Sequence, residues 1–206
     1  MTTANGTNET PYENSTPRQI LLAATQLFAL YGFDAVSVKQ IAELAGANSA
    51  LISYYYGGKR HLYLEVLNTQ MEAFQHIIAE VQNLNDSPRK KLQKYVNDLC
   101  AFQATSPNSV QLIFREILSP QPTCEEFVKN KLYILHTFMT KLVAESITAG
   151  EMHTKMAPTH VAFTVEGIIL FYFLMHKEVR ELGKFAYGQE MDYLRTAINS
   201  YLESIS

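Results

Sequence analysis

The chain has 206 residues, of which 47% are apolar and 18% are charged, with nine glycines and seven prolines. This composition is close to that of average globular proteins and excludes collagen-like, low-complexity and disordered chains. The formal net charge is -3, because 17 basic residues face 20 acidic ones. The whole chain therefore lacks the positive excess that would by itself predict a nucleic-acid or membrane partner, and any such partner must be recognised locally.

The polar N-terminus and the two cysteines predict a cytoplasmic protein. Residues 1–16 hold no basic stretch followed by an apolar one, so we expect no secretory signal. Cys100 and Cys124 lack C-x-x-C spacing and are too few for a disulfide scaffold, which fits reduced thiols. The apolar run from Val161 to Met175 is shorter than the roughly 20 residues of a membrane span, so we expect a buried helix and no membrane partner.

Apolar residues recur at three- and four-residue spacing through almost the whole chain, which predicts an all-α fold of about nine helices. The first helix is expected to begin at Thr16-Pro17, with Thr16 as its N-cap, and to end at Gly32. A short second helix begins at Ser37, which forms an S-x-x-Q capping box with Gln40.

A third short helix follows closely. Gly46 ends the second helix, and Asn48 offers the N-cap of a helix that runs to about Tyr55. Two short helices joined by a tight turn that contains glycine predict a helix-turn-helix. After Gly57-Gly58, a long helix is expected from Lys59 to about Leu84.

The rest of the chain predicts further helices over 88–105, 108–118, 123–149, 158–182 and 189–204. The helix over 158–182 is apolar on more than one face, so it must be covered on several sides. The last helix carries an apolar stripe of its own. Together these two helices predict a two-fold, four-helix interface between the subunits of a homodimer.

The stretch from Ile20 to Leu64 carries three motifs: A-A-x-x-L-F-x-x-Y-G-F, V-S-V-K-Q-I-A-x-x-A-G and I-S-Y-Y-Y-G-G-K-x-x-L-Y. In order and spacing it resembles the DNA-binding domain of the TetR family of transcriptional regulators. The resemblance implies a flexible tail over 1–16, a helix-turn-helix DNA-binding domain over 17–62, and a helical effector-binding and dimerisation domain over 63–206.

The third helix carries the small and polar residues that reading a major groove requires. Leu51 and Ser53 stand where many family members carry Thr or Ser and then Tyr, so the phosphate contacts made there are expected to be weakened or replaced by apolar contact with sugar or a thymine methyl. The resemblance adds phosphate contacts, through a helix N-terminus and a lysine, and implies that Ile52 and Tyr56 pack inward. The expected DNA-binding residues are Ser37, Asn48, Ser49, Ala50, Ser53, Tyr54, Tyr55 and Lys59.

Charge over the predicted DNA-binding domain is modest. Between residues 17 and 62, Arg18, Lys39, Lys59 and Arg60 stand against Asp34 and Glu43, a net +2. We therefore expect a shallow salt dependence of DNA binding and a need for two subunits on the DNA.

By the same resemblance, the later helices should enclose a small-molecule effector. A carboxylate at Glu166, among apolar neighbours, is costly unless it is paired, neutralised or bound to a ligand. Its structural partner would be Arg115, His136 or a residue across the dimer. Candidate pocket residues put an aromatic or polar group in an apolar helical context: Phe102, Gln103, Phe114, Arg115, Tyr133, His136, Phe163 and Glu166.

The resulting hypothesis is a homodimeric repressor that binds a palindromic DNA operator and is released by a small-molecule effector. The alternative is a helical small-molecule or protein-binding module whose helix-turn-helix is purely structural. A helical enzyme using Glu166 and His136 is a third hypothesis, although no catalytic or cofactor-binding motif is present. The six histidines lack metal-ligand spacing, so neither a metal nor a cofactor is expected.

Overall fold

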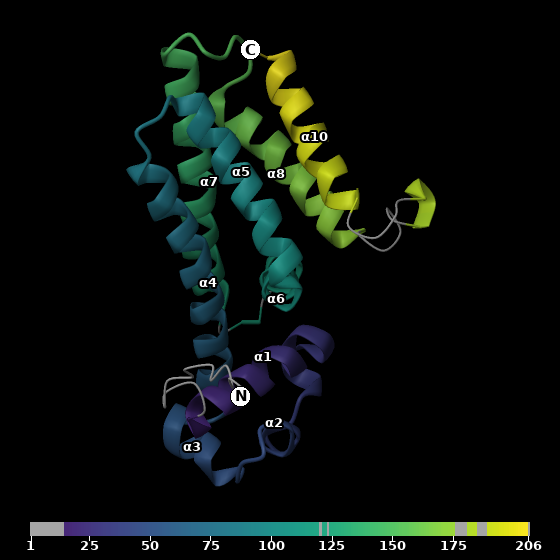
Figure 1. Cartoon of the computed structure of the whole chain (residues 1–206). Coiled ribbons are helices and arrows are strands. Elements are labelled where there is room, and N and C mark those ends of the chain that lie inside the picture. Colours follow the sequence, from purple (N-terminus) through teal and green to yellow (C-terminus); the bar gives the residue numbers. More distant parts are fainter. Residues whose placement is uncertain (1–14, 120, 123, 176–180, 185–188, 206) are drawn as a thin grey trace, which may run out of the picture. The chain divides into compact units, whose positions relative to one another are not determined.

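The computed structural model describes residues 15–119, 121, 122, 124–175, 181–184 and 189–205. Within these ranges every regular element is a helix and no strand occurs, as the apolar spacing predicts. The chain divides into two compact units, one that ends at Thr69 and one that begins at Gln70 (Figure 1).

The first unit begins with α1 (Thr16–Ala35). Its N-cap is Ser15 rather than Thr16, because Thr16 already adopts helical geometry, and Pro17 lies in the first turn. The helix is interrupted at Gly32, where φ is 79° and ψ is 169°. A left-handed φ of this kind favours glycine, so the predicted stop at Gly32 is confirmed, although one more helical turn follows it.

The two short helices are α2 (Val38–Leu44) and α3 (Ala50–Tyr56), and both pack against α1. The capping box at the start of α2 is confirmed: Ser37 Oγ accepts from the Gln40 N–H, and Gln40 Oε1 accepts from the Ser37 N–H at 2.8 Å. At α3 the N-cap is Ser49 rather than Asn48. Asn48 still serves the first turn, because its Oδ1 accepts from the Ala50 N–H at 2.9 Å.

The long helix α4 (Lys59–Asn83) contains the boundary between the two units. Its first turns belong to the core of the first unit, where Tyr63 packs edge-on against Phe28 with ring centroids 4.8 Å apart. In the second unit, Gln70 is buried and its Oε1 accepts from the hydroxyl of Ser109.

The second unit adds α5 (Pro88–Thr105), α6 (Pro107–Leu118), α7 (Glu125–Thr148), α8 (Pro158–Leu174) and α10 (Gln189–Ser204). The predicted helix over 158–182 is too long, because α8 ends at Leu174 and Met175 leaves helical geometry. The apolar run on which this prediction rests also ends at Met175. The predicted end at residue 182 rests only on the absence of Gly and Pro between Met175 and Gly183.

Helices α5, α7, α8 and α10 form a closed ring of contacts, with α5 on α7, α7 on α8, α8 on α10, and α10 on α5 (Figure 1). The core between them is almost wholly apolar. Cys100 lies inside it, and burial raises the pKa of its thiol to about 11, which keeps the thiol protonated at neutral pH. The apolar seams on four helices therefore hold this unit together.

One polar atom in this core stands out. Tyr95 is fully buried, its ring lies edge-on to Phe138 at 4.9 Å, and its hydroxyl has no hydrogen-bond partner among the described residues. Burial, and secondarily the charge of Glu166, raises the pKa of Tyr95 above its ordinary range.

Because the Tyr95 hydroxyl makes no bond to the described residues, Tyr95→Phe should leave the free energy of unfolding within about 0.5 kcal/mol of the wild-type value or raise it. Chemical denaturation measures this change, and Leu92→Ala on the same helix is the control, with an expected loss of about 2–5 kcal/mol. A loss above about 1.5 kcal/mol in Tyr95→Phe would show that the hydroxyl is bonded in the folded protein.

Candidate DNA interface and effector region

Helix α3 has an inner face that packs against the first unit and an outer face that is exposed. Ile52 is fully buried. Tyr56 is partly buried, and its hydroxyl donates to the Pro17 carbonyl at 2.7 Å, which ties the end of α3 to the start of α1. Partial burial, and secondarily Glu65, raises the pKa of Tyr56, so the phenol stays a donor. The inward packing of Ile52 and Tyr56 is confirmed.

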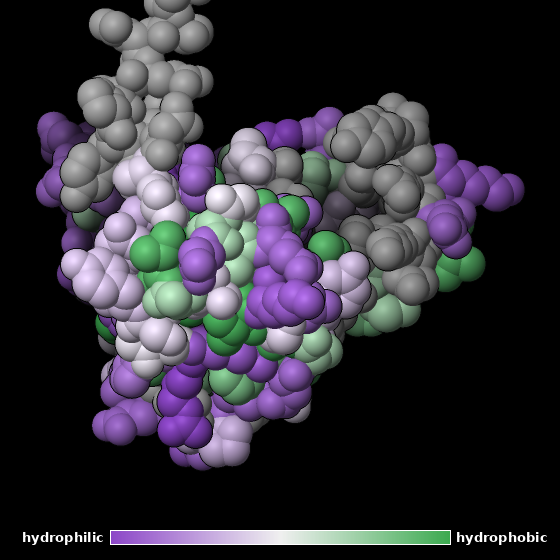
Figure 2. Space-filling model, turned by 90° about the horizontal axis from the view of Figure 1, so that it is seen from below, coloured by the Kyte–Doolittle hydropathy of each residue, from purple (hydrophilic) through white to green (hydrophobic). Residues whose placement is uncertain are grey.

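The outer face of α3 and the turn before it consist of small, polar and aromatic side chains. Tyr54 is 79% exposed, and its ring lies edge-on to that of Tyr55 at 4.9 Å. Figure 2 views the end of the molecule where polar side chains lie among small apolar patches. All the predicted base- and phosphate-contacting residues of this segment are exposed: Asn48, Ser49, Ala50, Ser53, Tyr54 and Tyr55.

Two predicted phosphate contacts, Ser37 and Lys59, lie outside α3, and the side chains of both already contact other residues of the first unit. Ser37 is exposed, but its hydroxyl belongs to the capping box of α2. Lys59 places its Nζ over the Phe33 ring, 4.3 Å from the ring centroid. Phe33 is not among the predicted DNA-binding residues, although it closes the Y-G-F motif. Only the packing of α1 against α4 brings its ring beneath the lysine.

The predicted effector residues are spread over α5, α6, α7 and α8. Phe102 is partly buried, with its ring edge-on to Phe74 at 5.0 Å. Phe114 and Arg115 are partly buried on α6, whereas Tyr133 is 71% exposed on α7. The side chain of Gln103 lies outside the described residues. The structure brings together the remaining three, His136, Phe163 and Glu166.

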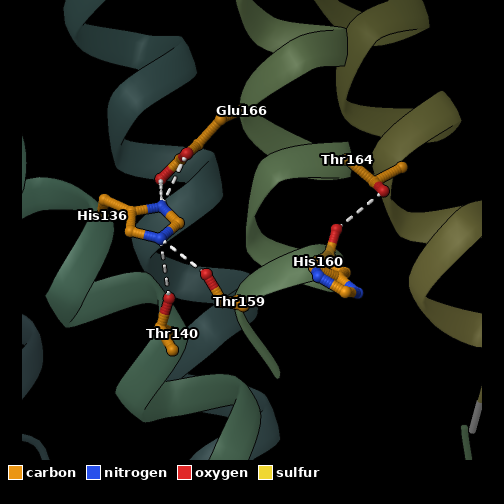
Figure 3. A network of polar contacts seen from close by, with 6 residues as sticks. All are labelled: His136, Thr140, Thr159, His160, Thr164 and Glu166. Carbon is orange, nitrogen blue, oxygen red and sulfur yellow. Dashed lines mark hydrogen bonds and ion pairs between the residues drawn. The ribbon is translucent and has the colours of Figure 1, made fainter. Parts of the chain in front are cut away.

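These three residues and two threonines make up what we term the Glu166 cluster: His136, Thr140, Thr159, Phe163 and Glu166. Figure 3 shows its members other than Phe163. His136 Nδ1 lies 2.9 and 3.2 Å from the two carboxylate oxygens of Glu166. Its Nε2 lies 2.9 Å from the Thr159 hydroxyl and 3.4 Å from that of Thr140. Phe163 stacks on the imidazole with ring centroids 4.2 Å apart.

Of the three partners considered for Glu166, the structure shows His136. Burial raises the pKa of Glu166, and the hydrogen bond from His136 partly offsets this rise. Thr140 follows His136 by four residues, so helical spacing could have indicated it. Thr159 could not be found in this way, because its contact depends on how α7 and α8 face each other.

Two surface grooves lie elsewhere in the second unit. One, of about 410 Å³, runs between α8 and α10 and is lined by Thr164, Gly167, Ile168, Phe171, Tyr172, Tyr193 and Ala197. The other, of about 440 Å³, lies between the start of α5 and the end of α7. None of the predicted effector residues lines either groove.

The described residues contain no group of three or more His, Cys, Asp or Glu side chains that would hold a metal ion. No helix within the same ranges is long and apolar enough to cross a membrane.

Two protein families match the chain in sequence. Residues 20–66 match the bacterial regulatory proteins of the tetR family, and residues 88–205 match the C-terminal domain of the HTH-type transcriptional dual regulator CecR. The regulator CecR of Shigella flexneri is 26% identical over 199 residues, which cover 90% of this chain and 82% of CecR. The regulator RutR of Escherichia coli K12 is 25% identical over 150 residues, which cover 72% of this chain and 69% of RutR.

Solved structures share the fold at lower identity. The ketosteroid transcriptional regulator KstR2 of Mycobacterium tuberculosis has a TM-score of 0.77 and 16% identity, with 94% of this chain and 96% of KstR2 covered. The MbdR regulator of Azoarcus sp. CIB has a TM-score of 0.74 and 20% identity, with 89% and 97% covered. With a helix-turn-helix matched at one end and a CecR-type domain over more than half its length, the chain belongs to the TetR family of DNA-binding transcriptional regulators and is not an enzyme.

Proposed function

We propose that this regulator is a cytoplasmic homodimer that represses transcription by binding a palindromic operator and leaves the DNA when a small-molecule effector binds. The observation that carries the proposal is the exposed polar face of α3, held on the buried Ile52 and on the bond from Tyr56 to Pro17. A helix anchored on one face and polar on the other suits insertion into a major groove. A purely structural helix-turn-helix has no need for such a face.

The exposed residues of α3 differ in how far their side chains extend from the helix. Ser49 and Ala50 start the helix, where a recognition helix meets base edges, and the small Ala50 permits close approach. Tyr54 and Tyr55 extend further from the helix and suit phosphate oxygens. Ser37 reaches a phosphate through the N-terminus of α2, because its side chain is already used in the capping box.

Lys59 is the charged phosphate contact of this proposal, and Phe33 positions it. A lysine side chain is flexible, and holding its ammonium over an aromatic face reduces the freedom that it would otherwise lose on binding DNA. The net charge of the segment is only +2 over residues 17–62, so each positioned cation contributes a large share of the electrostatic affinity.

The dimer interface of the proposal lies on α8 and α10. On α8, exposed residues recur at four-residue spacing: Phe163 is 59% exposed, Gly167 is exposed, and Phe171 is 62% exposed. Tyr193 of α10 lines the groove between α8 and α10 and is 51% exposed. Large apolar side chains on one face, with a small residue between them, suit close packing against a second copy of the same pair of helices.

Control by a small molecule is proposed by analogy with structural neighbours. A regulator from Saccharomonospora viridis was solved in complex with choline, and AibR in complex with isovaleryl coenzyme A and operator DNA. In this chain, α4 joins the helix-turn-helix to the second unit, so it is the element through which an effector would act. A differential affinity of a few kcal/mol between two states of the dimer suffices for such control.

The DNA interface is tested by selecting random duplexes on the purified protein at near-physiological salt. We expect an inverted repeat whose half-sites lie about one helical turn apart. Tyr54→Ala should weaken binding to the selected duplex by about tenfold to a hundredfold, because one hydrogen bond is lost in each half-site. Tyr133→Ala, which removes another exposed tyrosine, is the control. Retention of no symmetric sequence, or loss of the dimer in Tyr54→Ala, would contradict the proposal.

The positioning role of Phe33 is tested by a double-mutant cycle with Lys59→Gln. Phe33→Leu keeps an apolar side chain but removes the ring, and should weaken operator binding by about fivefold to thirtyfold for two subunits. In the Lys59→Gln background the same change should have little effect. An equal loss in both backgrounds would mean that Phe33 acts through the core of the first unit instead.

The dimer interface is tested by Phe171→Glu, which places a charge in the centre of the apolar face without disturbing the core. Light scattering should show a monomer of about 23.3 kDa, whereas the wild type and Tyr133→Glu should be dimers. A Phe171→Glu protein that remains dimeric would place the interface elsewhere.

A further inference from the structure

The Glu166 cluster places one carboxylate between α7 and α8, with His136 as its nitrogen partner. His136 Nδ1–H donates to the carboxylate, and Nε2 lies within reach of the Thr159 hydroxyl, which can donate to it. In its ionised form this carboxylate carries one negative charge at the seam between α7 and α8.

This carboxylate also retains capacity for another donor. From the described residues Glu166 receives one N–H, from Nδ1 of His136, whereas an ionised carboxylate offers about four acceptor positions. Its side chain is 29% exposed and that of His136 is 21% exposed, so a small molecule reaches the cluster from solvent. The Phe163 ring, stacked on His136, covers part of this approach.

The surroundings add aromatic faces and unpaired polar atoms. Tyr95 is fully buried, the charge of Glu166 contributes to its raised pKa, and its hydroxyl has no partner among the described residues. On α10, Asn199 Oδ1 is buried and is likewise unpaired within the described ranges. The start of α5 and the end of α10 lie at the same end of the bundle, since the Arg89 N–H donates to Glu151 and the His153 N–H donates to the Ile205 carbonyl.

We propose that the Glu166 cluster is the polar end of the effector site and that it binds a protonated amine with an apolar or aromatic body. The ammonium group donates to Glu166 and lies against the face of Phe163, while the body of the molecule covers the apolar seam. This assignment rests on the proposed function, in which the second unit receives the effector. A carboxylate or phosphate ligand is disfavoured, because its charge would face that of Glu166.

The test measures binding of charged and neutral probes to the full-length protein by isothermal titration calorimetry. The probes are phenethylamine, phenylbutylamine and hexylamine, each compared with the alcohol and the carboxylic acid of the same skeleton. We expect the amines to bind more tightly than the alcohols, and the acids to bind most weakly.

The matched variants are Glu166→Gln, which can still accept from His136 but carries no charge, and Glu145→Gln, which removes the exposed α7 carboxylate beside Lys141. Glu166→Gln should weaken amine binding by about tenfold and Glu145→Gln should not change it. Phe163→Leu, which keeps an apolar side chain on the proposed dimer face but removes the ring, should also weaken the amines and provides a test if Glu166→Gln does not fold.

Three results would overturn the assignment. The acids could bind as tightly as the amines, the amines could bind equally to the wild type, Glu166→Gln and Phe163→Leu, or none of the three amines could bind. Measuring operator affinity with and without the amine distinguishes a failure of the amine site from a failure of the proposed release of DNA. Glu166-dependent amine binding that leaves operator affinity unchanged would support the site and overturn the release of DNA by the effector.

Discussion

The anchoring of α3 is the constraint on which the DNA interface depends. A helix of seven residues is too short to be stable alone, so α3 keeps its position only through contacts with the rest of the first unit. Ile52 supplies apolar burial, and Tyr56 supplies a directional bond to the Pro17 carbonyl. Because these two residues fix the rotation of the helix about its axis, they also determine which side chains are exposed to DNA.

Helix α8 serves several packing partners at once. One side is buried in the four-helix ring, another carries Glu166 toward α7, and a third leaves Phe163 and Phe171 exposed. This distribution explains why the helix is apolar on more than one face. Phe163 belongs both to the apolar face and to the Glu166 cluster, since it stacks on His136. In the proposed dimer, the effector site therefore lies at the edge of the subunit interface.

The two units differ in how they use polar groups. In the first unit, the capping box of Ser37 and the bond of Tyr56 satisfy donors and acceptors locally and keep the helices in place. In the second unit, the Tyr95 hydroxyl and Asn199 Oδ1 are buried without partners among the described residues. Unsatisfied buried groups lower stability, and a protein tolerates them most readily where another molecule completes the bonding.

The sequence by itself determined the all-α fold, the stop at Gly32, the capping box at Ser37 and the helix-turn-helix, because spacing and capping depend on residues within about four positions of each other. Only the tertiary structure decided which of three partners Glu166 takes, that Lys59 lies over Phe33, and that α8 ends at Leu174. The first two are contacts between helices, such as that of His136 and Glu166 across 30 positions. Local periodicity says which face of a helix is buried, whereas packing decides which helix it meets.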